Sequence, residues 1–560
     1  MTDSTAPTPP PAPLRPVVDA AFAARLRAVF TAAEFTADGC LDLLGAAAYA
    51  ALARSETVPA LRATGGGSAR ETLLRLFLLQ RPVPRAAAEA AGLPVQQCLA
   101  DGWLTADGED TQDTQAGQGT GTGQDTQAAP DGDGLVRATV DIRPYANDIY
   151  VHDADAHEAG GEPADEPGDA WIVSDLGCSV GGVPRAELVL GVGGASTTLA
   201  NITVRRPVRR VLDLGTGSGV QALHAARHAA SVTATDVNPR ALHFTRLTAA
   251  LSGLDAIETR QGSLFEPVSG ETFDLVVSNP PFVISPGGRF TYRDGGMPGD
   301  ELCRRLVAGA GRQLEPGGYC QLLANWQHVR GEDWRARLSG WIAGTGCDAW
   351  VVQREVQDIF QYAELWLRDG GDHRQDRAEY DARYQEWLDA FEAAKVEGVG
   401  FGWITLRRAP EGREPVLVAE EWPHPVEQPL GPEIEHWFAR QDFLREQDDA
   451  GLLAAHYLLA DEVVQEQIGA PGAEDPEHVV LRQNRGMCRA TKVDTVGAGF
   501  AGACDGSLPA GSILDAIAHL VGEAPALLRD RAPEQIRLLV EQGFLIPAAL
   551  DEAEDRAGAV

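Results

Sequence analysis

Apolar runs in the middle of the chain predict strands that are buried on both faces. Two of them cover residues 211–214 and 273–278 and end in glycine and in an Asn-Pro pair, and the stretch 231–236 between them looks like a further strand that ends in aspartate. Short continuous apolar runs with such ends are typical of parallel strands in an α/β protein. Weaker runs predict further strands at 256–259, 319–324, 350–353 and 400–407, with a helix at 217–230 and mostly helical chain at 358–395. This alternation predicts an α/β fold around a largely parallel sheet.

The ends of the three central strands carry residue types that bind ligands. The first strand runs into Gly215, Gly217 and Gly219, which let the chain bend sharply and let a ligand touch its backbone. The second ends at Asp236, 21 residues after Gly215, the spacing of a carboxylate that binds ribose hydroxyls in a Rossmann-type crevice. The third ends in Asn-Pro-Pro-Phe, residues 279–282. Open α/β sheets bind their ligands at this edge.

Together these motifs resemble those of a known enzyme family. Asp213-x-Gly-x-Gly-x-Gly219, Asp236-Val-Asn-Pro239 and Asn279-Pro-Pro-Phe282 resemble the class I S-adenosylmethionine-dependent N-methyltransferases, in particular the subset that methylates planar amino or amide nitrogens. The resemblance covers about residues 208–408. It implies an α/β, Rossmann-like methyltransferase sheet of seven strands, and S-adenosyl-L-methionine as cofactor.

The resemblance also implies a cofactor site. Ser263 stands where the family commonly has an aspartate that accepts a hydrogen bond from the adenine amino group, and Leu264 would form a wall for the adenine ring. The expected cofactor-binding residues are Asp213, Gly215, Gly217, Gly219, Asp236, Asn238, Ser263 and Leu264.

The tetrapeptide is the expected catalytic motif. The lone pair of an amide or exocyclic amine nitrogen is delocalised, and acceptors aimed at its N–H bonds stabilise the positive charge that grows there during methylation. Asn279 would supply its side-chain oxygen and Pro280 its carbonyl, while Pro281 helps to restrict the backbone. Phe282 would stack on the flat acceptor. Neither a metal ion nor a general base with a shifted pKa is needed.

Two signals point to different methyl acceptors. Asp294-Gly-Gly296 and the later Pro316-Gly-Gly318 look like glutamine methyltransferases of peptide-chain release factors. Leu323-Ala-Asn-Trp326 looks more like guanine N2-methyltransferases of ribosomal RNA. The expected partner is a macromolecule, with a protein glutamine slightly favoured over an RNA base (guanine N2 or adenine N6). A non-catalytic, cofactor-binding regulatory protein ranks third, and the Gly-x-Gly-x-Gly turn disfavours an NAD-dependent dehydrogenase.

Composition divides the flanking chain into segments. We expect a disordered tail at 1–16, a helical, winged-helix-like domain at 17–104, an acidic flexible linker at 105–134 and an adapter with short strands (135–142, 148–152 and 171–174) at 135–205. The methyltransferase domain would span 206–410, followed by a helical, winged-helix-like domain at 411–560 that includes helices at 511–521 and 533–543. The N-terminal helical domain would either recognise the substrate or nucleic acid, or only pack against the catalytic sheet and shield it. The Gly/Ser/Thr-rich run at 188–199 would either lie across the cofactor pocket or form a plain connecting turn before the methyltransferase domain.

Net charge and the distribution of cysteines limit the class of protein and the compartment that we expect. The net charge of −34 excludes a protein held to nucleic acid by a general basic surface, although residues 101–170 alone hold 17 acidic and 2 basic residues. The basic run Arg205–Arg210 is interpreted as a solvated strand entry rather than a phosphate site. Eight scattered cysteines, no membrane-length apolar run and no signal peptide predict a cytoplasmic protein. His224 and His228 are expected to be a surface pair without metal.

Overall fold

The computed structural model of the 560-residue chain describes residues 16–52, 54, 56–106, 134–146, 169–177, 187–287, 292–374, 376–471 and 478–550. The chain forms two compact units. The first comprises Met1–Ala200 and Arg206–Trp422, and the second Asn201–Arg205 and Pro423–Val560. The predicted tail up to residue 15, residues 107–133 of the predicted linker and the strand expected at 148–152 lie outside the described residues.

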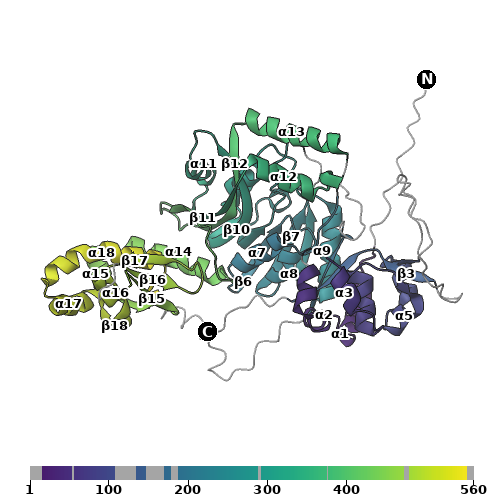
Figure 1. The fold of residues 1–560 in the computed structure, drawn as a ribbon, viewed down its shortest axis with the longest axis horizontal. Coiled ribbons are helices and arrows are strands. Elements are labelled where there is room, and N and C mark those ends of the chain that lie inside the picture. Colours follow the sequence, from purple (N-terminus) through teal and green to yellow (C-terminus); the bar gives the residue numbers. More distant parts are fainter. Residues whose placement is uncertain are drawn as a thin grey trace. The chain divides into compact units, whose positions relative to one another are not determined.

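The first unit is built on an eight-stranded mixed sheet (Figure 1) in the order β13-β11-β12-β10-β9-β6-β7-β8. Its strands are β6 (Val208–Leu214), β7 (Ala229–Asp236), β8 (Ile257–Gln261), β9 (Phe273–Ser278), β10 (Leu314–Val329), β11 (Cys347–Asp358), β12 (Val396–Arg408) and β13 (Leu417–Glu421). The predicted number of strands, seven, was one too few. β13 pairs with β11 in parallel at the edge of the sheet, beyond the boundary expected at residue 410.

The register of β6 and β9 sets up the site. The two strands run parallel, with Asp213 opposite Val277 and Leu214 opposite Ser278. Side chains such as Leu212 and Val276 are fully buried, and each contributes about 1.5–3 kcal/mol to stability. Because both strands end at the same level, the glycine turn and the tetrapeptide leave the same edge of the sheet side by side.

Helices pack on the sheet, one of them (α7) before its first strand in the sequence and the others between its strands. They are α7 (Gly194–Ile202), α8 (Val220–Ala225), α9 (Pro239–Ser252), α10 (Glu301–Ala310) and α11 (Trp334–Ile342), with the 3₁₀ turn η3 (Glu266–Val268). The helix expected at 217–230 is shorter than predicted. Gly219 precedes it at φ +87°, and Ala229 already belongs to β7. His224 is 3% exposed and its Nε2 lies 2.9 Å from the Tyr145 hydroxyl, so the expectation of a surface pair was wrong for this residue.

A helical pair lies between β11 and β12, as the sequence predicts for 358–395. It consists of α12 (Ile359–Asp369), the turn η4 (Asp372–Arg374) and α13 (Arg377–Ala393), which lie together in Figure 1. Tyr362 and Phe391 pack in one buried cluster with Val283 and Ile284, which follow the tetrapeptide. The insert is therefore attached directly to the loop that leaves the site.

The N-terminal helices share a core with the sheet's helix α9. They are α1 (Ala20–Ala32), α2 (Ala37–Leu52), α3 (Val58–Ala63), α4 (Ala69–Leu73), the π-helical η1 (Leu74–Leu78), α5 (Arg85–Ala90) and α6 (Val95–Asp101). β1 (Val83–Pro84), β2 (Leu104–Ala106) and β3 (Leu135–Ala138) form a small antiparallel sheet, and β4 (Asp141–Tyr145) pairs with β5 (Ala170–Ser174). Phe30, Trp171 and Phe244 belong to one buried cluster. The winged-helix description stays a prediction.

The second unit mixes helices with two three-stranded sheets, and its winged-helix description stays a prediction. Its helices are α14 (Gly431–Glu446), α15 (Asp449–Ala454), α16 (Thr495–Gly502), α17 (Ala510–Val521) and α18 (Pro525–Glu541). The sheets are β18-β14-β19 and β15-β16-β17, from β14 (His456–Leu459), β15 (Val463–Ile468), β16 (His478–Gln483), β17 (Ala490–Val493), β18 (Asp505–Pro509) and β19 (Leu545–Pro547). The helix expected to start at Pro533 begins at Pro525 and continues through that proline, which is buried.

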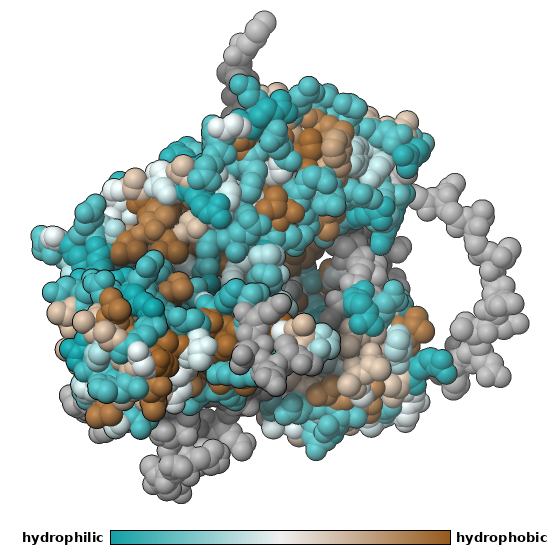
Figure 2. All heavy atoms as spheres, turned by 60° about the vertical axis from the view of Figure 1, so that its left-hand side comes forward, coloured by the Kyte–Doolittle hydropathy of each residue, from teal (hydrophilic) through white to brown (hydrophobic). Residues whose placement is uncertain are grey.

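The surface shows no extended apolar belt on the face drawn in Figure 2, where hydrophobic residues form separate patches among hydrophilic ones. Within the described residues, no helix combines the length and the apolar character needed to span a bilayer. The arginines at the entry to β6 are paired as expected. Arg210 forms a 2.5 Å ion pair with Glu271, and Arg209 lies 3.7 Å from Asp274.

Candidate active site

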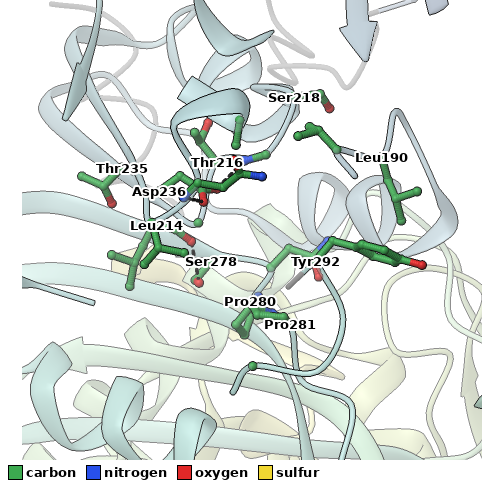
Figure 3. Close-up of a pocket in the computed structure, with 18 of the residues that line it drawn as sticks. Leu190, Leu214, Thr216, Ser218, Thr235, Asp236, Ser278, Pro280, Pro281 and Tyr292 are labelled. Atoms are coloured by element: carbon green, nitrogen blue, oxygen red, sulfur yellow. Dashed lines mark hydrogen bonds between the residues drawn. The ribbon is translucent and has the colours of Figure 1, made fainter. Parts of the chain in front are cut away.

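A cavity of about 430 Å³ opens at the carboxyl ends of β6, β7 and β9. This volume lies in the range of small-molecule and cofactor sites. Figure 3 shows Thr216 and Asp236 on one side of the cavity and Pro280 and Pro281 on the other. The structure thus brings the second and third sequence motifs to the same cavity as the glycine turn. Nine of the predicted site residues line it: Gly215, Gly217, Asp236, Asn238, Ser263, Leu264, Asn279, Pro280 and Pro281.

The glycine turn forms a cradle. Gly215 and Gly217 have φ values of +76° and +58°, in the left-handed region where a side chain costs energy. A β-carbon placed on either glycine would meet no atom within 4 Å, so the backbone faces open space. The N–H groups of Gly215 and Thr216 both donate to the Thr235 carbonyl, at 2.8 and 2.9 Å, which ties the turn to β7.

Asp213 and Gly219 support the turn and do not line the cavity, and their part in cofactor binding stays a prediction. Asp213 is 1% exposed, and its Oδ2 accepts hydrogen bonds from the Thr216 hydroxyl at 2.7 Å and the Ala222 N–H at 2.9 Å. Burial raises the pKa of Asp213 to about 7, although these two hydrogen bonds oppose the shift. A β-carbon on Gly219 would lie 3.2 Å from Thr245, so this glycine permits close packing on α9.

Asp236 and Asn238 stand at the end of β7. The Asp236 carboxylate accepts hydrogen bonds from the Gly217 N–H at 3.1 Å and the Asn238 N–H at 2.9 Å, and burial raises its pKa. Asn238 lines the cavity, but its side chain is engaged elsewhere. Its Oδ1 caps α9 at Arg240, and its Nδ2 donates to the Glu187 carbonyl. Asn238 therefore acts mainly by holding other parts of the wall.

Thr235 is a wall residue that the sequence reasoning missed. Its Oγ1 is buried in the cavity wall and has no hydrogen-bond partner among the described residues. A buried hydroxyl without a partner is costly unless a ligand supplies one. The position immediately before Asp236 was the only signal for this residue in the sequence.

Three of the four tetrapeptide residues line the cavity. The amide of Asn279 makes no hydrogen bond to any described residue, and Pro280 is buried beside it. Phe282 is instead half-buried and packs against the hydrophobic cluster that contains Leu212 and Val276. Because its side chain contributes to the core and not to the cavity wall, the predicted stacking role of Phe282 is not supported.

A strap formed by residues 187–196 completes one wall, as one of the two interpretations of the 188–199 run anticipates. The Val189 N–H donates to Asp175 Oδ2 at 2.9 Å, and Asp175 is paired in turn with Arg240 of α9. The Gln221 amide donates to the Ser196 carbonyl at 2.8 Å. These contacts hold the strap against α8 and α9.

The remaining wall comes from the segment that follows the tetrapeptide, including Tyr292, Asp294 and Met297. The sequence signal was the Asp-Gly-Gly motif, which pointed to a family but not to a position in the cavity. The wall as a whole holds two carboxylates, Asp236 and Asp294, and no lysine, arginine or histidine among the described residues. In the part of the chain that the structure describes, no group of three or more metal-ligating side chains occurs.

Comparison with known proteins agrees with the resemblance carried by the motifs. Residues 191–333 match the family described as "Methyltransferase small domain". Residues 32–115 and 435–547 match families described as "Domain of unknown function", DUF7059 and DUF7782.

Curated relatives fall into two groups. A release factor glutamine methyltransferase of Xylella fastidiosa is 36% identical over 168 residues, which cover 28% of this chain and 60% of the relative. A ribosomal RNA small subunit methyltransferase C of Alcanivorax borkumensis is 35% identical over 116 residues, 21% of this chain and 32% of the relative. The chain thus spans less than two thirds of the length of these relatives.

Solved structures of methyltransferases also align with part of the chain. A phosphoethanolamine N-methyltransferase 2 of Haemonchus contortus in complex with S-adenosyl-L-methionine is 14% identical, with a TM-score of 0.26. The alignment covers 39% of this chain and 53% of that one.

Proposed function

We propose that the protein is an S-adenosylmethionine-dependent N-methyltransferase that modifies a planar amide or amino nitrogen of a macromolecule, with a protein glutamine as the favoured acceptor. The observation that carries the proposal is the shared cavity. The glycine cradle with Asp236 and the Asn279–Pro280 pair line one space of about 430 Å³, from neighbouring strand ends. A donor and an acceptor bound there would be held in contact, which is the main contribution that such an enzyme makes.

The residues present fit the proposed cofactor. The open cradle at Gly215 and Gly217 lets a ligand touch the protein backbone, and Asp236 would accept hydrogen bonds from ribose hydroxyls. Thr235 offers a buried hydroxyl that lacks a protein partner among the described residues. S-adenosylmethionine supplies a methyl group on a positively charged sulfonium, which requires no cationic residue in the wall.

The acceptor would be held by Asn279 and Pro280. The unengaged Asn279 amide oxygen and the Pro280 carbonyl are two hydrogen-bond acceptors for the two N–H bonds of a primary amide or exocyclic amine. Prolines at 280 and 281 restrict the backbone before the acceptor binds, so little ordering entropy is lost on binding. As positive charge develops on the nitrogen, both oxygens stabilise it.

The charge of the wall favours a glutamine over a nucleotide. A nucleotide would carry a phosphate towards a wall with two carboxylates and no cation in the described residues. A glutamine side chain is neutral, so it avoids this repulsion. The Xylella relative, whose name describes a release factor glutamine methyltransferase, supports the same choice. The ribosomal RNA relatives keep an RNA base as the second candidate.

The test is a labelling experiment. The purified chain is incubated with S-adenosylmethionine tritiated on the methyl group and with two substrates, purified peptide-chain release factors and total ribosomal RNA. We expect label in the release factor, at a glutamine identified by peptide mass spectrometry. Label in RNA alone would show that the acceptor is an RNA base. A fractionated cell extract is tested in parallel, and the absence of label from both substrates and from every fraction would refute the proposed activity.

A further inference from the structure

The acceptor side of the cavity contains a buried ion pair that the proposed chemistry does not yet use. Arg293 and Asp294 are 6% and 4% exposed, and Arg293 Nε lies 2.9 Å from Asp294 Oδ1. Two charges buried in this way are costly unless both make good hydrogen bonds. Asp294 lines the cavity, whereas Arg293 does not. Asp294 is therefore the member of the pair that belongs to the cavity wall.

Arg293 is fixed from behind by helix α12. Its Nη1 donates to the Trp366 carbonyl at 2.9 Å, and the guanidinium lies over the Trp366 ring at 5.8 Å. Asp369, at the end of the same helix, lies 3.5 Å from Nη1. A guanidinium can make these contacts at once because its donors form a planar fork. Its position, and through it that of the Asp294 carboxylate, is thereby set by α12.

The same segment lies directly against the tetrapeptide. The Val283 N–H donates to the Arg293 carbonyl at 2.9 Å. A β-carbon on Gly295, which has φ +55°, would come within 2.7 Å of the Pro281 carbonyl oxygen. Only glycine permits this approach, and it places the residue beside Asp294 in contact with the motif that would hold the acceptor.

We propose that Asp294 is an acceptor-binding residue, and that Arg293 is the residue that positions it. The inference rests on the proposed function. The Asp294 carboxylate would accept a hydrogen bond from an N–H group of the incoming amide or amine, next to the contacts made by Asn279 and Pro280. A carboxylate has about four lone-pair sites, so it can accept a hydrogen bond from a ligand in addition to those from the protein. In a wall without cations among the described residues, its charge also favours the nitrogen as that atom becomes positive.

The test compares Asp294→Asn with the wild type and with a matched control, Asp300→Asn. Asp300 is 5% exposed and pairs with Arg337 at 2.7 Å, yet it does not line the cavity. For Asp294→Asn we expect kcat/KM for the acceptor to fall about 10- to 100-fold, mainly through KM, with unchanged affinity for S-adenosylhomocysteine by calorimetry. Asp300→Asn should keep both quantities within about twofold.

Two further variants separate binding from a structural role. Asp294→Glu keeps the charge but moves it by one methylene group, so KM should rise only severalfold. Arg293→Lys loses the fork and should raise KM in the same way as Asp294→Glu. Should Asp294→Asn fail to fold, the KM of Asp294→Glu decides.

Each outcome has one meaning. If the wild type labels an acceptor and the KM of the Asp294 variant stays within twofold of the wild-type KM, only this inference is overturned and the proposed function stands. A fall in S-adenosylhomocysteine affinity that matches the fall in kcat/KM also overturns it, because the residue would then be structural. A wild type that labels nothing overturns the proposed function itself.

Discussion

The hydroxyl oxygen of Tyr362 accepts a hydrogen bond from the Ile284 N–H at 2.9 Å, and so joins helix α12 to the chain two residues beyond the tetrapeptide. The same oxygen accepts a second hydrogen bond from Asn325 Nδ2 at 3.1 Å. Tyr362 is fully buried, and burial raises its pKa well above the ordinary value. Together with the contacts of Arg293, this arrangement makes α12 a support for Ile284 and Arg293, two described residues that follow the tetrapeptide.

Removal of that hydroxyl should loosen the loop. In Tyr362→Phe the buried N–H groups of Ile284 and Asn325 lose their acceptor, which costs about 1–3 kcal/mol of unfolding free energy. Methyl transfer should fall while S-adenosylhomocysteine still binds. Urea unfolding and calorimetry measure the two effects. Tyr384→Phe is the control, because the Tyr384 hydroxyl donates only to an exposed carbonyl, and it should change stability by less than about 0.5 kcal/mol.

Thr235 provides a test of the cofactor site that spares the fold. Its hydroxyl has no partner in the described chain, so Thr235→Val should leave stability unchanged or raise it. If the hydroxyl binds the cofactor, affinity for S-adenosylhomocysteine should fall about fivefold, the value of one hydrogen bond near 1 kcal/mol.

Thr405 of β12 is the matched control for this substitution. Its buried hydroxyl also lacks a partner in the described chain, but it lies outside the cavity wall. Thr405→Val should therefore leave the affinity alone. Equal affinities in the two valine variants would remove Thr235 from the cofactor site.

Asp213 should make stability fall as the pH rises. Its pKa is about 7 in the folded protein and about 3.9 when unfolded, so between these values only the folded chain keeps the proton. Folding then takes up a proton, and the native state loses up to about 4 kcal/mol from pH 4 to pH 7.

Asp213→Asn removes this titration and isolates it from all other groups. The difference in unfolding free energy between wild type and variant, measured by urea titration, should therefore shift against the wild type between pH 4.5 and pH 7.5. A difference that does not vary with pH would contradict the assignment of the raised pKa.

Much of the sheet could be predicted from the sequence, because β6 and β9 contain short apolar runs and the central strands end in conspicuous turns. The bounds of β9, Phe273–Ser278, agree with the prediction. β13 was missed because Leu417–Glu421 has only three apolar residues, followed by two glutamates, so its apolar run is short and not alternating. In the second unit, β15 (Val463–Ile468) has the same weakness.

The site was predictable where the backbone itself carries the chemistry. Glycines and prolines announce special backbone geometry, so the cradle and the tetrapeptide could be found. The direction of a side chain could not be read in this way. Phe282 packs against the core, the Asn238 side chain binds α9 and the strap, and Asp294 is paired with Arg293. Several of these contacts join segments distant in sequence, such as Arg293 and α12.

The most direct measurement of the central claim compares methyl transfer by the wild type and by Asn279→Ala, with S-adenosylhomocysteine affinity measured on the same preparations. The Asn279 side-chain amide makes no hydrogen bond to any described residue, so its removal should leave the fold and the cofactor site intact. We expect the rate of transfer to fall at least about 100-fold at unchanged affinity, as for the loss of one oxygen that stabilises a developing charge. A variant that transfers methyl groups at the wild-type rate would contradict the account.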